Sequence, residues 1–331
     1  MMKFSLAKVA VSGASGFVGR ALCRRLLDQG VAVLGASRQI SVPPLFSDRL
    51  YTQLALGDIG PSTDWATALD GVETVIHLAA RVHVMRDTVA DPLAEFCRVN
   101  VMGTEHLARC AAASGVKRLV YVSSIKVNGE ATHGEQKFTA ADTPAPQDPY
   151  GISKWGAEQA LHRVADATGL EVVIVRPPLV YGPGVKGNFA HMLDIVAKGI
   201  PLPFASAHNR RDLIYVGNLA DALVACAAHP AAAGQTYLAC DGEPISTPDL
   251  LRQLAAGMGV RARLFPCPPS LLDLAGKLTG KSQQLERLLG SLQVDGDKMR
   301  RALDWTPPYS LRQGLQITAE WRRTNSHGES P

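Results

Sequence analysis

Runs of branched aliphatic residues alternate with stretches of helical spacing through the first half of the chain. Runs rich in Val and Ile at 7–13, 31–37, 74–80, 118–124 and 171–178 predict buried strands. Apolar residues recur at helical spacing in 17–30, in 91–114 and again from about residue 150. Strands that are apolar on both faces and joined by helical crossovers are typical of parallel sheets. The pattern therefore predicts an α/β fold with a doubly wound parallel sheet.

The pattern changes after residue 178. Pro and Gly cluster at 177–187 and 199–204, helical spacing recurs at 217–229, 246–258 and 268–290, and strong strands are few. Residues 179–323 are therefore expected to form a smaller, more helical substrate lobe, while elements from about 212–240 return to the sheet domain. The polar tail 324–331 is predicted to be disordered.

The composition narrows the class of protein. Of the 331 residues, 46% are hydrophobic, and the net charge of +4 is spread along the chain. A nucleic-acid-binding protein usually carries a basic stripe, so we expect no nucleic-acid partner. The six cysteines form no CxxC pair, which predicts buried thiols in a reducing compartment and no metal site. No window approaches eighteen apolar residues, so we expect a soluble, cytoplasmic protein without membrane insertion.

A glycine-rich turn follows the first predicted strand. In GASGFVG, the residues Gly13, Gly16 and Gly19 stand where the strand ends and a helix begins. A tight turn, a close approach of the backbone to a pyrophosphate and a helix N-terminus facing negative charge all favour glycine there. This context predicts a Rossmann-type sheet with a dinucleotide site, and residues 1–178 are expected to form an NAD(P)-binding domain.

The end of the second predicted strand indicates which dinucleotide is bound. An NAD site usually carries Asp or Glu there, which accepts hydrogen bonds from the ribose hydroxyls. The chain has Ser37 followed by Arg38. A hydroxyl and a guanidinium can bind a 2′-phosphate, which a carboxylate would repel. NADP(H) is therefore favoured, and NAD(H) stays open if Arg38 is simply solvated.

The stretch DPYGISKWGAEQ carries a tyrosine and a lysine four residues apart. Asp148 and Pro149 suit the start of a helix, which places Tyr150 and Lys154 on one face, one turn apart. The pKa of a free tyrosine is about 10, and a nearby ammonium lowers it by stabilising the phenolate. The strand at 118–124 ends in two serines at the edge where ligands sit in such sheets. The pattern predicts a proton-transfer site.

Together these motifs resemble the extended short-chain dehydrogenase/reductases, the NAD-dependent epimerase/dehydratase family that acts on nucleotide sugars. Besides GxxGxxG and YxxxK, the resemblance extends to about residue 320 through GDI (57–59), HLAA (77–80), NVMGT (100–104), YVSS (121–124), RPPLVYGPG (176–184) and RRDLIYVGNLADA (210–222). It implies hydride transfer at a carbinol carbon of a UDP-sugar. The catalytic residues would be Tyr150, which exchanges the proton, Lys154, which holds the ribose, and Ser124, which binds the reacting oxygen.

The resemblance also implies which residues contact the cofactor and the substrate. The cofactor set is Gly13, Ser15, Gly16, Phe17, Val18, Gly19, Ser37, Arg38, Asp58, Ile59, Leu78, Ala79, Ala80, Asn100, Tyr150, Lys154 and Pro177. The substrate set is Ser123, Ser124, Tyr150, Asn188, Arg211, His83 and Arg86, with Arg211 matching the family arginine that binds the diphosphate.

Structural readings of several residues stay open at this point. Asp58 suits a turn, Asn100 the interior of a helix and Asn188 a helix N-cap, and Arg211 can pair with Asp212. Lys126 and Asn128 replace the Thr and Tyr of many UDP-galactose 4-epimerases, and can face the substrate or solvent. Leu179 replaces an asparagine of the same enzymes. His77, in an apolar strand, is expected to be a core histidine.

Three functions are consistent with this sequence. The phrases ARVHVMRD and SSIKVNGE resemble a bacterial subgroup implicated in O-antigen and capsule sugars, which implies reduction of the C4 ketone of a UDP-4-keto-6-deoxy-N-acetylhexosamine. Ser37–Arg38 and Leu179 also favour the reductase. The alternative is a UDP-hexose 4-epimerase, which returns the hydride to the opposite face and therefore needs tightly bound NAD. A non-catalytic NADP(H) sensor is disfavoured by the Tyr/Lys pair. The family resemblance also implies a homodimer formed through helices of the first domain.

Overall fold

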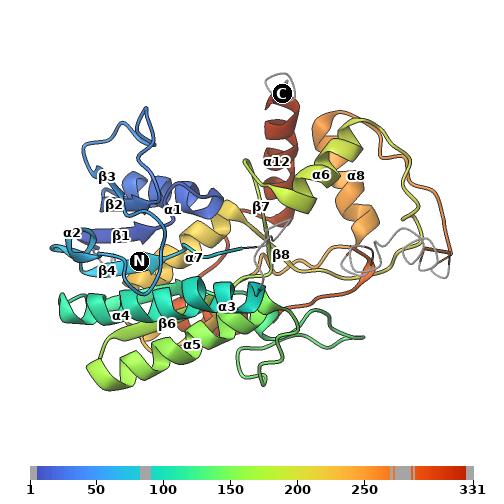
Figure 1. Ribbon diagram of the computed structural model, residues 1–331. Coiled ribbons are helices and arrows are strands. Elements are labelled where there is room, and N and C mark those ends of the chain that lie inside the picture. Colours follow the sequence, from blue (N-terminus) through green and yellow to red (C-terminus); the bar gives the residue numbers. More distant parts are fainter. Residues whose placement is uncertain (1–5, 83–90, 269–270, 273–284, 286–287, 326–331) are drawn as a thin grey trace.

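A seven-stranded parallel sheet lies at the centre of the larger lobe (Figure 1). The computed structural model describes residues 6–82, 91–268, 271, 272, 285 and 288–325. The strands are β1 (Lys8–Ser12), β2 (Ala32–Ser37), β3 (Tyr51–Ala55), β4 (Thr74–His77), β5 (Arg118–Val122), β6 (Glu171–Arg176) and β9 (Thr236–Leu238). Their order is β3-β2-β1-β4-β5-β6-β9, so the topology reverses between β1 and β4, and ligands bind beyond the carboxyl ends of the strands at such a point. The predicted doubly wound parallel sheet is confirmed.

Helices cover both faces of this sheet because successive strand residues point to opposite sides. Val9 and Val11 of β1 pack with α1 (Phe17–Asp28) and α7 (Val216–Ala228), whereas Ala10 packs on the other side with α4 (Gly103–Ala113) and α5 (Pro149–Thr168). The two sides form separate buried cores. The first core also receives α11 (Asp297–Leu303), and the second receives the short helix α2 (Ala66–Leu69).

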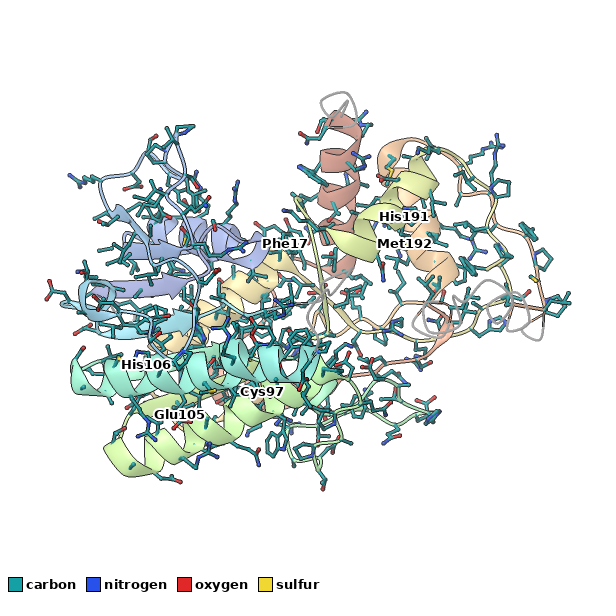
Figure 2. All side chains as sticks on the ribbon, viewed as in Figure 1. Phe17, Cys97, Glu105, His106, His191 and Met192 are labelled. Atoms are coloured by element: carbon teal, nitrogen blue, oxygen red, sulfur yellow. The ribbon has the colours of Figure 1, made fainter. Side chains whose placement is uncertain are left out.

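In the described part of the chain, the smaller lobe contains the helices α6 (Gly187–Ala197), α8 (Thr247–Met258) and α12 (Leu311–Asn325) and a pair of short parallel strands, β7 (Leu179–Tyr181) and β8 (Leu213–Tyr215). Their apolar side chains form a core of their own. Between β8 and α8, the chain returns to the larger lobe to contribute α7 and β9. Phe17, at the start of α1, packs against the smaller lobe's core and lies on the side toward α6, which carries His191 and Met192 (Figure 2).

Several elements differ from those the sequence predicts. The helix expected at 91–114 is interrupted: α3 (Pro92–Phe96) leads into a π-helical segment, η1 (Cys97–Met102), and then into α4. The half-exposed edge strand β3 and the three-residue strands were not predicted, since their apolar runs are too short or incomplete. Two short 3₁₀ turns, η2 (Ile125–Val127) and η3 (Pro230–Ala232), complete the assignment. The helix α12 extends to Asn325, two residues into the tail expected to be disordered.

Candidate active site

The glycine-rich turn packs so closely that side chains would obstruct it. Gly13 has φ +74°, and a Cβ added there would lie 3.0 Å from the amide nitrogen of Ala79 at the end of β4. A Cβ on Gly19 would lie 2.1 Å from the carbonyl oxygen of Gly13. Ser15 and Gly16 are exposed at the start of α1, and the first turn of α1 contains no acidic residue. The turn and the helix N-terminus therefore fit the pyrophosphate of a dinucleotide.

The remaining predicted cofactor residues lie along the same edge of the sheet. Phe17 and Val18 begin α1, residues 78–80 follow β4, and Pro177 follows β6. The exposed Asp58 and the half-buried Ile59 lie in the loop after β3. At the end of β2, the buried Ser37 donates a hydrogen bond to the carbonyl of Gln39 over 2.8 Å, and Arg38 is exposed. No carboxylate occupies the position where an NAD site usually has one.

A buried histidine holds the strand ends around the turn. The side chain of Ser12 accepts hydrogen bonds from the amides of Leu78 and Ala79, both over 3.2 Å. It also shares a 2.6 Å hydrogen bond with Nδ1 of His77, whose Nε2 lies 3.0 Å from Oγ1 of Thr104. Burial lowers the pKa of His77 to about 3, so the imidazole is neutral. His77 is a hydrogen-bonded core residue, as predicted.

Asn100 links the loop after β4 by hydrogen bonds to α5, the helix that carries Tyr150. Its Oδ1 accepts from the amide of Arg81 over 2.8 Å, while its Nδ2 donates to the carbonyl of Arg81 over 3.0 Å and to Oγ of Ser153 over 2.9 Å. The side chain is 1% exposed and lies in the π-helical segment. Such segments are frequent at functional sites. Through these bonds, Asn100 fixes the backbone that borders the expected cofactor site.

Tyr150 and Lys154 lie in the first two turns of α5, as the spacing predicts. Asp148 caps this helix by accepting a 2.7 Å hydrogen bond from the amide of Gly151. The Nζ of Lys154 donates to the carbonyl of Val122 over 2.7 Å and to the hydroxyl of Tyr121 over 3.1 Å. It lies 5.9 Å from the ring centre of Tyr150. Lys154 is 2% exposed, and burial lowers its pKa to about 7.

The electrostatics of Tyr150 differ from the sequence-based expectation. We expected the ammonium of Lys154 to lower the pKa of Tyr150, but burial and then the Asp148 carboxylate raise it. The reason is geometric, since the ammonium is directed at Val122 and Tyr121. Both burial and the carboxylate favour the protonated phenol.

The two serines after β5 have different surroundings. Ser124 is half-buried and caps the 3₁₀ turn η2 by accepting a 3.3 Å hydrogen bond from the amide of Lys126. Ser123 is 3% exposed and donates a 2.5 Å hydrogen bond to Oε1 of Glu158. The placement of Ser124 is compatible with a substrate contact. For Ser123 the contact stays a prediction, and this buried hydrogen bond does not favour it.

Beneath these serines lies a buried ionic network that the sequence reasoning missed. Arg176 donates to Oε1 of Glu158 from Nε over 2.9 Å and to Oε2 from Nη2 over 2.5 Å. Its Nη1 donates to Oδ1 of Asn128 over 3.0 Å, and Asn128 donates to the carbonyl of Thr139 over 2.7 Å. Asn128 is 3% exposed and therefore faces neither substrate nor solvent. One available signal was Glu158, which lies one helical turn after Lys154.

The substrate residues predicted on the smaller lobe are less buried. Nη1 of the half-buried Arg211 donates to the carbonyl of Gly290 over 2.8 Å, while Oδ2 of the buried Asp212 accepts from the amide of Val294. Asn188 is exposed in the first turn of α6, whose N-cap is Lys186, so the N-cap reading was wrong. Leu179 begins β7 and is 49% exposed. His83 and Arg86 lie outside the described residues.

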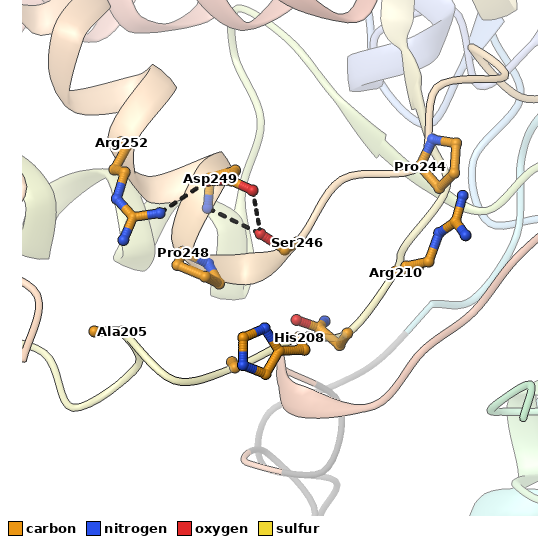
Figure 3. Close-up of a pocket in the computed structure, with 10 residues that line it drawn as sticks. Ala205, His208, Arg210, Pro244, Ser246, Pro248, Asp249 and Arg252 are labelled. Atoms are coloured by element: carbon orange, nitrogen blue, oxygen red, sulfur yellow. Dashed lines mark hydrogen bonds and ion pairs between the residues drawn. The ribbon is translucent and has the colours of Figure 1, made fainter. Parts of the chain in front are cut away.

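A separate cavity of about 340 Å³ lies in the smaller lobe (Figure 3). It is bounded by residues 205–210 and by the start of α8, where Ser246, Asp249 and Arg252 are linked by hydrogen bonds and an ion pair. None of the predicted site residues lines it. The predicted catalytic residues lie at the carboxyl edge of the sheet and do not line this cavity.

Known proteins resemble the chain over nearly its whole length. The model of the "NAD dependent epimerase/dehydratase family" matches residues 9–240. A UDP-glucose 4-epimerase of Vibrio cholerae is 42% identical over 94% of both chains. An N-acetyl-alpha-D-glucosaminyl-diphospho-ditrans,octacis-undecaprenol 4-epimerase of Escherichia coli O157:H7 is 28% identical over 95% of this chain and 94% of its own. Among solved structures, MoeE5 in complex with UDP-glucuronic acid and NAD is 25% identical, with a TM-score of 0.76 over 96% of this chain and 100% of that chain.

Proposed function

The chain belongs to the NAD-dependent epimerase/dehydratase family, and from this premise we propose that it interconverts UDP-hexoses by oxidation and reduction at C4. The 42% identity to a UDP-glucose 4-epimerase over nearly the full length of both chains carries this proposal. The residues Ser124, Tyr150 and Lys154 gather at the carboxyl edge of the sheet, beside a glycine turn that fits a dinucleotide. This arrangement supports the same chemistry.

Each residue of the trio has a distinct task in this proposal. When bound, the nicotinamide ring supplies the hydride acceptor and donor. Tyr150 moves the proton at the C4 oxygen of the sugar, and Ser124 donates a hydrogen bond to that oxygen. Lys154, whose Nζ is directed at the carbonyl of Val122 and the hydroxyl of Tyr121, would hold the ribose of the bound nucleotide.

A 4-keto reductase is the second candidate because the residues at the end of β2 favour NADP(H). Arg38 is exposed there, and no acidic residue stands at that position. This favours the 2′-phosphate of NADP(H), an exchangeable reductant, over tightly held NAD. Replacing Arg38 by Glu should weaken NADP(H) binding at least about tenfold more than NAD(H) binding, because a carboxylate repels the extra phosphate. Equal losses for both cofactors would remove the support for a reductase.

One incubation experiment separates the two candidates. The purified protein is given UDP-glucose or UDP-GlcNAc without added cofactor and, separately, UDP-4-keto-6-deoxy-GlcNAc with NADPH. Formation of the C4 epimers supports the epimerase, whereas oxidation of NADPH without epimer formation supports the reductase. Turnover of none of these substrates would contradict both proposals.

Replacement of the tyrosine tests the catalytic assignment directly. Tyr150→Phe removes the transferable proton and is expected to lower kcat by about 10²- to 10⁴-fold. Cofactor binding, followed by fluorescence titration of the reduced nicotinamide, should change little. Unchanged turnover by the variant would contradict the proton-transfer role of Tyr150.

We further propose that the protein is a homodimer formed through the helices α3 to α5. Large apolar side chains are exposed on these elements, with Leu93 at 39%, Met102 at 50% and Ile152 at 40% exposure. Light scattering of the wild type and of Met102→Glu tests this, since a charge in such an interface should favour the monomer. As for membranes, none of the helices within the described ranges is long and apolar enough to span one.

A further inference from the structure

Lys126 lies between the two segments that carry the predicted catalytic hydroxyls. It belongs to η2, two residues after Ser124. Its Nζ donates to Oε1 of Glu130 over 2.9 Å and forms an ion pair with Oδ2 of Asp148, two residues before Tyr150. The backbones are close here too, since a Cβ on Gly151 would lie 3.0 Å from the carbonyl oxygen of Lys126. The lysine therefore joins the serine segment to the start of α5.

Asp148 has two tasks whose effects on Tyr150 oppose each other. Its Oδ1 accepts from the amide of Gly151 and caps α5, so it fixes where the helix begins. Its negative charge, however, stands beside the phenol and raises the pKa of Tyr150. Asp148 and Lys126 are only 18% and 24% exposed in their side chains, so solvent screens their interaction incompletely.

We propose that Lys126 is a positioning residue for proton transfer, which holds the Asp148 carboxylate in the cap of α5 and compensates its charge beside Tyr150. The inference rests on the proposed function, in which Tyr150 transfers the proton. Lys126 itself contacts no reacting atom in this scheme. Nothing in the family resemblance assigns it a role, and it stands where many UDP-galactose 4-epimerases have another residue.

Other charged, aromatic and polar groups lie around Tyr150 on the neighbouring elements. Lys154 lies one turn further along α5, with its Nζ 5.9 Å from the Tyr150 ring centre. The Phe96 ring of α3 lies 6.2 Å from that of Tyr150, centre to centre, and the guanidinium of Arg81 lies over the Phe96 ring, 5.6 Å from its centre. The hydroxyl of Tyr121 approaches from β5 through Lys154. A replacement of Lys126 leaves all of these groups in place, so a change at Tyr150 can be ascribed to the lost ammonium.

The test measures the dependence of kcat on pH in four variants. Lys126→Met keeps the length of the side chain without its charge. In the plot of kcat against pH, it should move to higher pH the limb that reflects ionisation of Tyr150. The expected shift is roughly half to one pH unit, because losing one unit charge near a partly exposed ionisable group changes its pKa by about that amount. Asp148→Asn retains a good N-cap and should move the limb to lower pH. In the double variant both charges are gone, so its limb should lie between those of the two single variants, near that of the wild type, and Lys126→Arg should behave like the wild type.

A second measurement distinguishes failure of this inference from failure of the proposed function. In urea unfolding, the midpoint lost by the double variant should be smaller than the sum of the two single losses, because the pair can be broken only once. Lys117→Met, at an exposed ion pair with Glu73, serves as the matched control and should change neither readout. The proposal is overturned if the Tyr150 limb of the kcat profile of Lys126→Met lies at the same pH as in the wild type. It is also overturned if the urea midpoint lost by the double variant equals the sum of the two single losses. If no UDP-sugar is turned over, the proposed function fails. The urea midpoints of the single and double variants then decide alone whether Lys126 and Asp148 stabilise each other.

Discussion

The buried pair of Glu158 and Arg176 should be the costliest place in the sheet domain to remove a single charge. Glu158 is fully buried and receives three hydrogen bonds, one from Ser123 and two from Arg176, which is itself 4% exposed. Glu158→Gln conserves the volume of the side chain. It replaces one oxygen by an amide that would face a guanidinium N–H, so Arg176 keeps a buried charge without its counterion.

The magnitude follows from this geometry. Removing one partner of a buried ion pair costs about 3–5 kcal/mol, because the other charge stays desolvated and unpaired. A typical protein has about 5–15 kcal/mol of stability in total. The matched control is Glu73→Gln, which breaks the exposed pair with Lys117, whose side chains are 42% and 74% exposed. Such surface pairs contribute about 0–1 kcal/mol.

Urea unfolding followed by tryptophan fluorescence measures both losses. With a slope of about 3 kcal/mol per molar, Glu158→Gln should lower the midpoint by about 1 M or more, and Glu73→Gln by at most about a third of that. The slopes must agree between variants for the comparison to hold. Similar midpoints for the two variants would refute the reasoning, since they would mean that Glu158 is not desolvated as the structure indicates.

Two further predictions concern the cofactor turn and the buried imidazole. Gly19→Ala places a methyl group 2.1 Å from the Gly13 carbonyl oxygen, so the turn must open, and dinucleotide affinity in a fluorescence titration should fall at least about tenfold; an unchanged affinity would argue against a pyrophosphate at this turn. The pKa of His77 is about 3 in the folded protein against 6.5 in the unfolded chain. The unfolded chain therefore binds the extra proton in this window, and stability should be lost as pH falls from about 6.5 toward 3. His77→Gln should flatten this dependence between pH 7 and pH 5 in urea midpoints, and a wild-type slope in the variant would contradict a neutral buried His77.

The sheet was predictable from the sequence because its central strands are apolar on both faces. The apolar runs that contain β1, β2, β4, β5 and β6 are long enough to be recognised as strands without knowing which strands they pair with. β3 is half-exposed at the edge, and β7, β8 and β9 have only three residues each, so tertiary pairing rather than local pattern makes them strands. The π-helical segment around Asn100 leaves helical periodicity nearly intact, and periodicity alone did not reveal it.

Spacing placed the candidate catalytic residues well, but it could not supply their electrostatics. Tyr150 and Lys154 are one turn apart whatever surrounds them. Whether the ammonium acts on the phenol depends on where Nζ points, which the Val122 carbonyl decides. Likewise, the sequence did not decide whether Asn128 and Lys126 face the substrate or solvent. Their partners, Arg176 and Asp148, lie 48 and 22 residues away in the sequence.

The network beneath Ser123 raises the question of what a buried ion pair contributes besides stability. Replacing both members by Met removes the unpaired charge together with its partner, and such exchanges are often neutral or stabilising. If Glu158→Met with Arg176→Met restores the urea midpoint lost by Glu158→Gln, the pair is not needed for stability as such. The hydroxyl of Ser123 would still lose its acceptor, and the segment that carries Ser124 would lose its hydrogen bond to Glu158 of α5, while the Lys126–Asp148 pair would remain. A reduced kcat at a restored midpoint would then assign the network to the placement of the catalytic serine, whereas full recovery of both would show that packing alone places it.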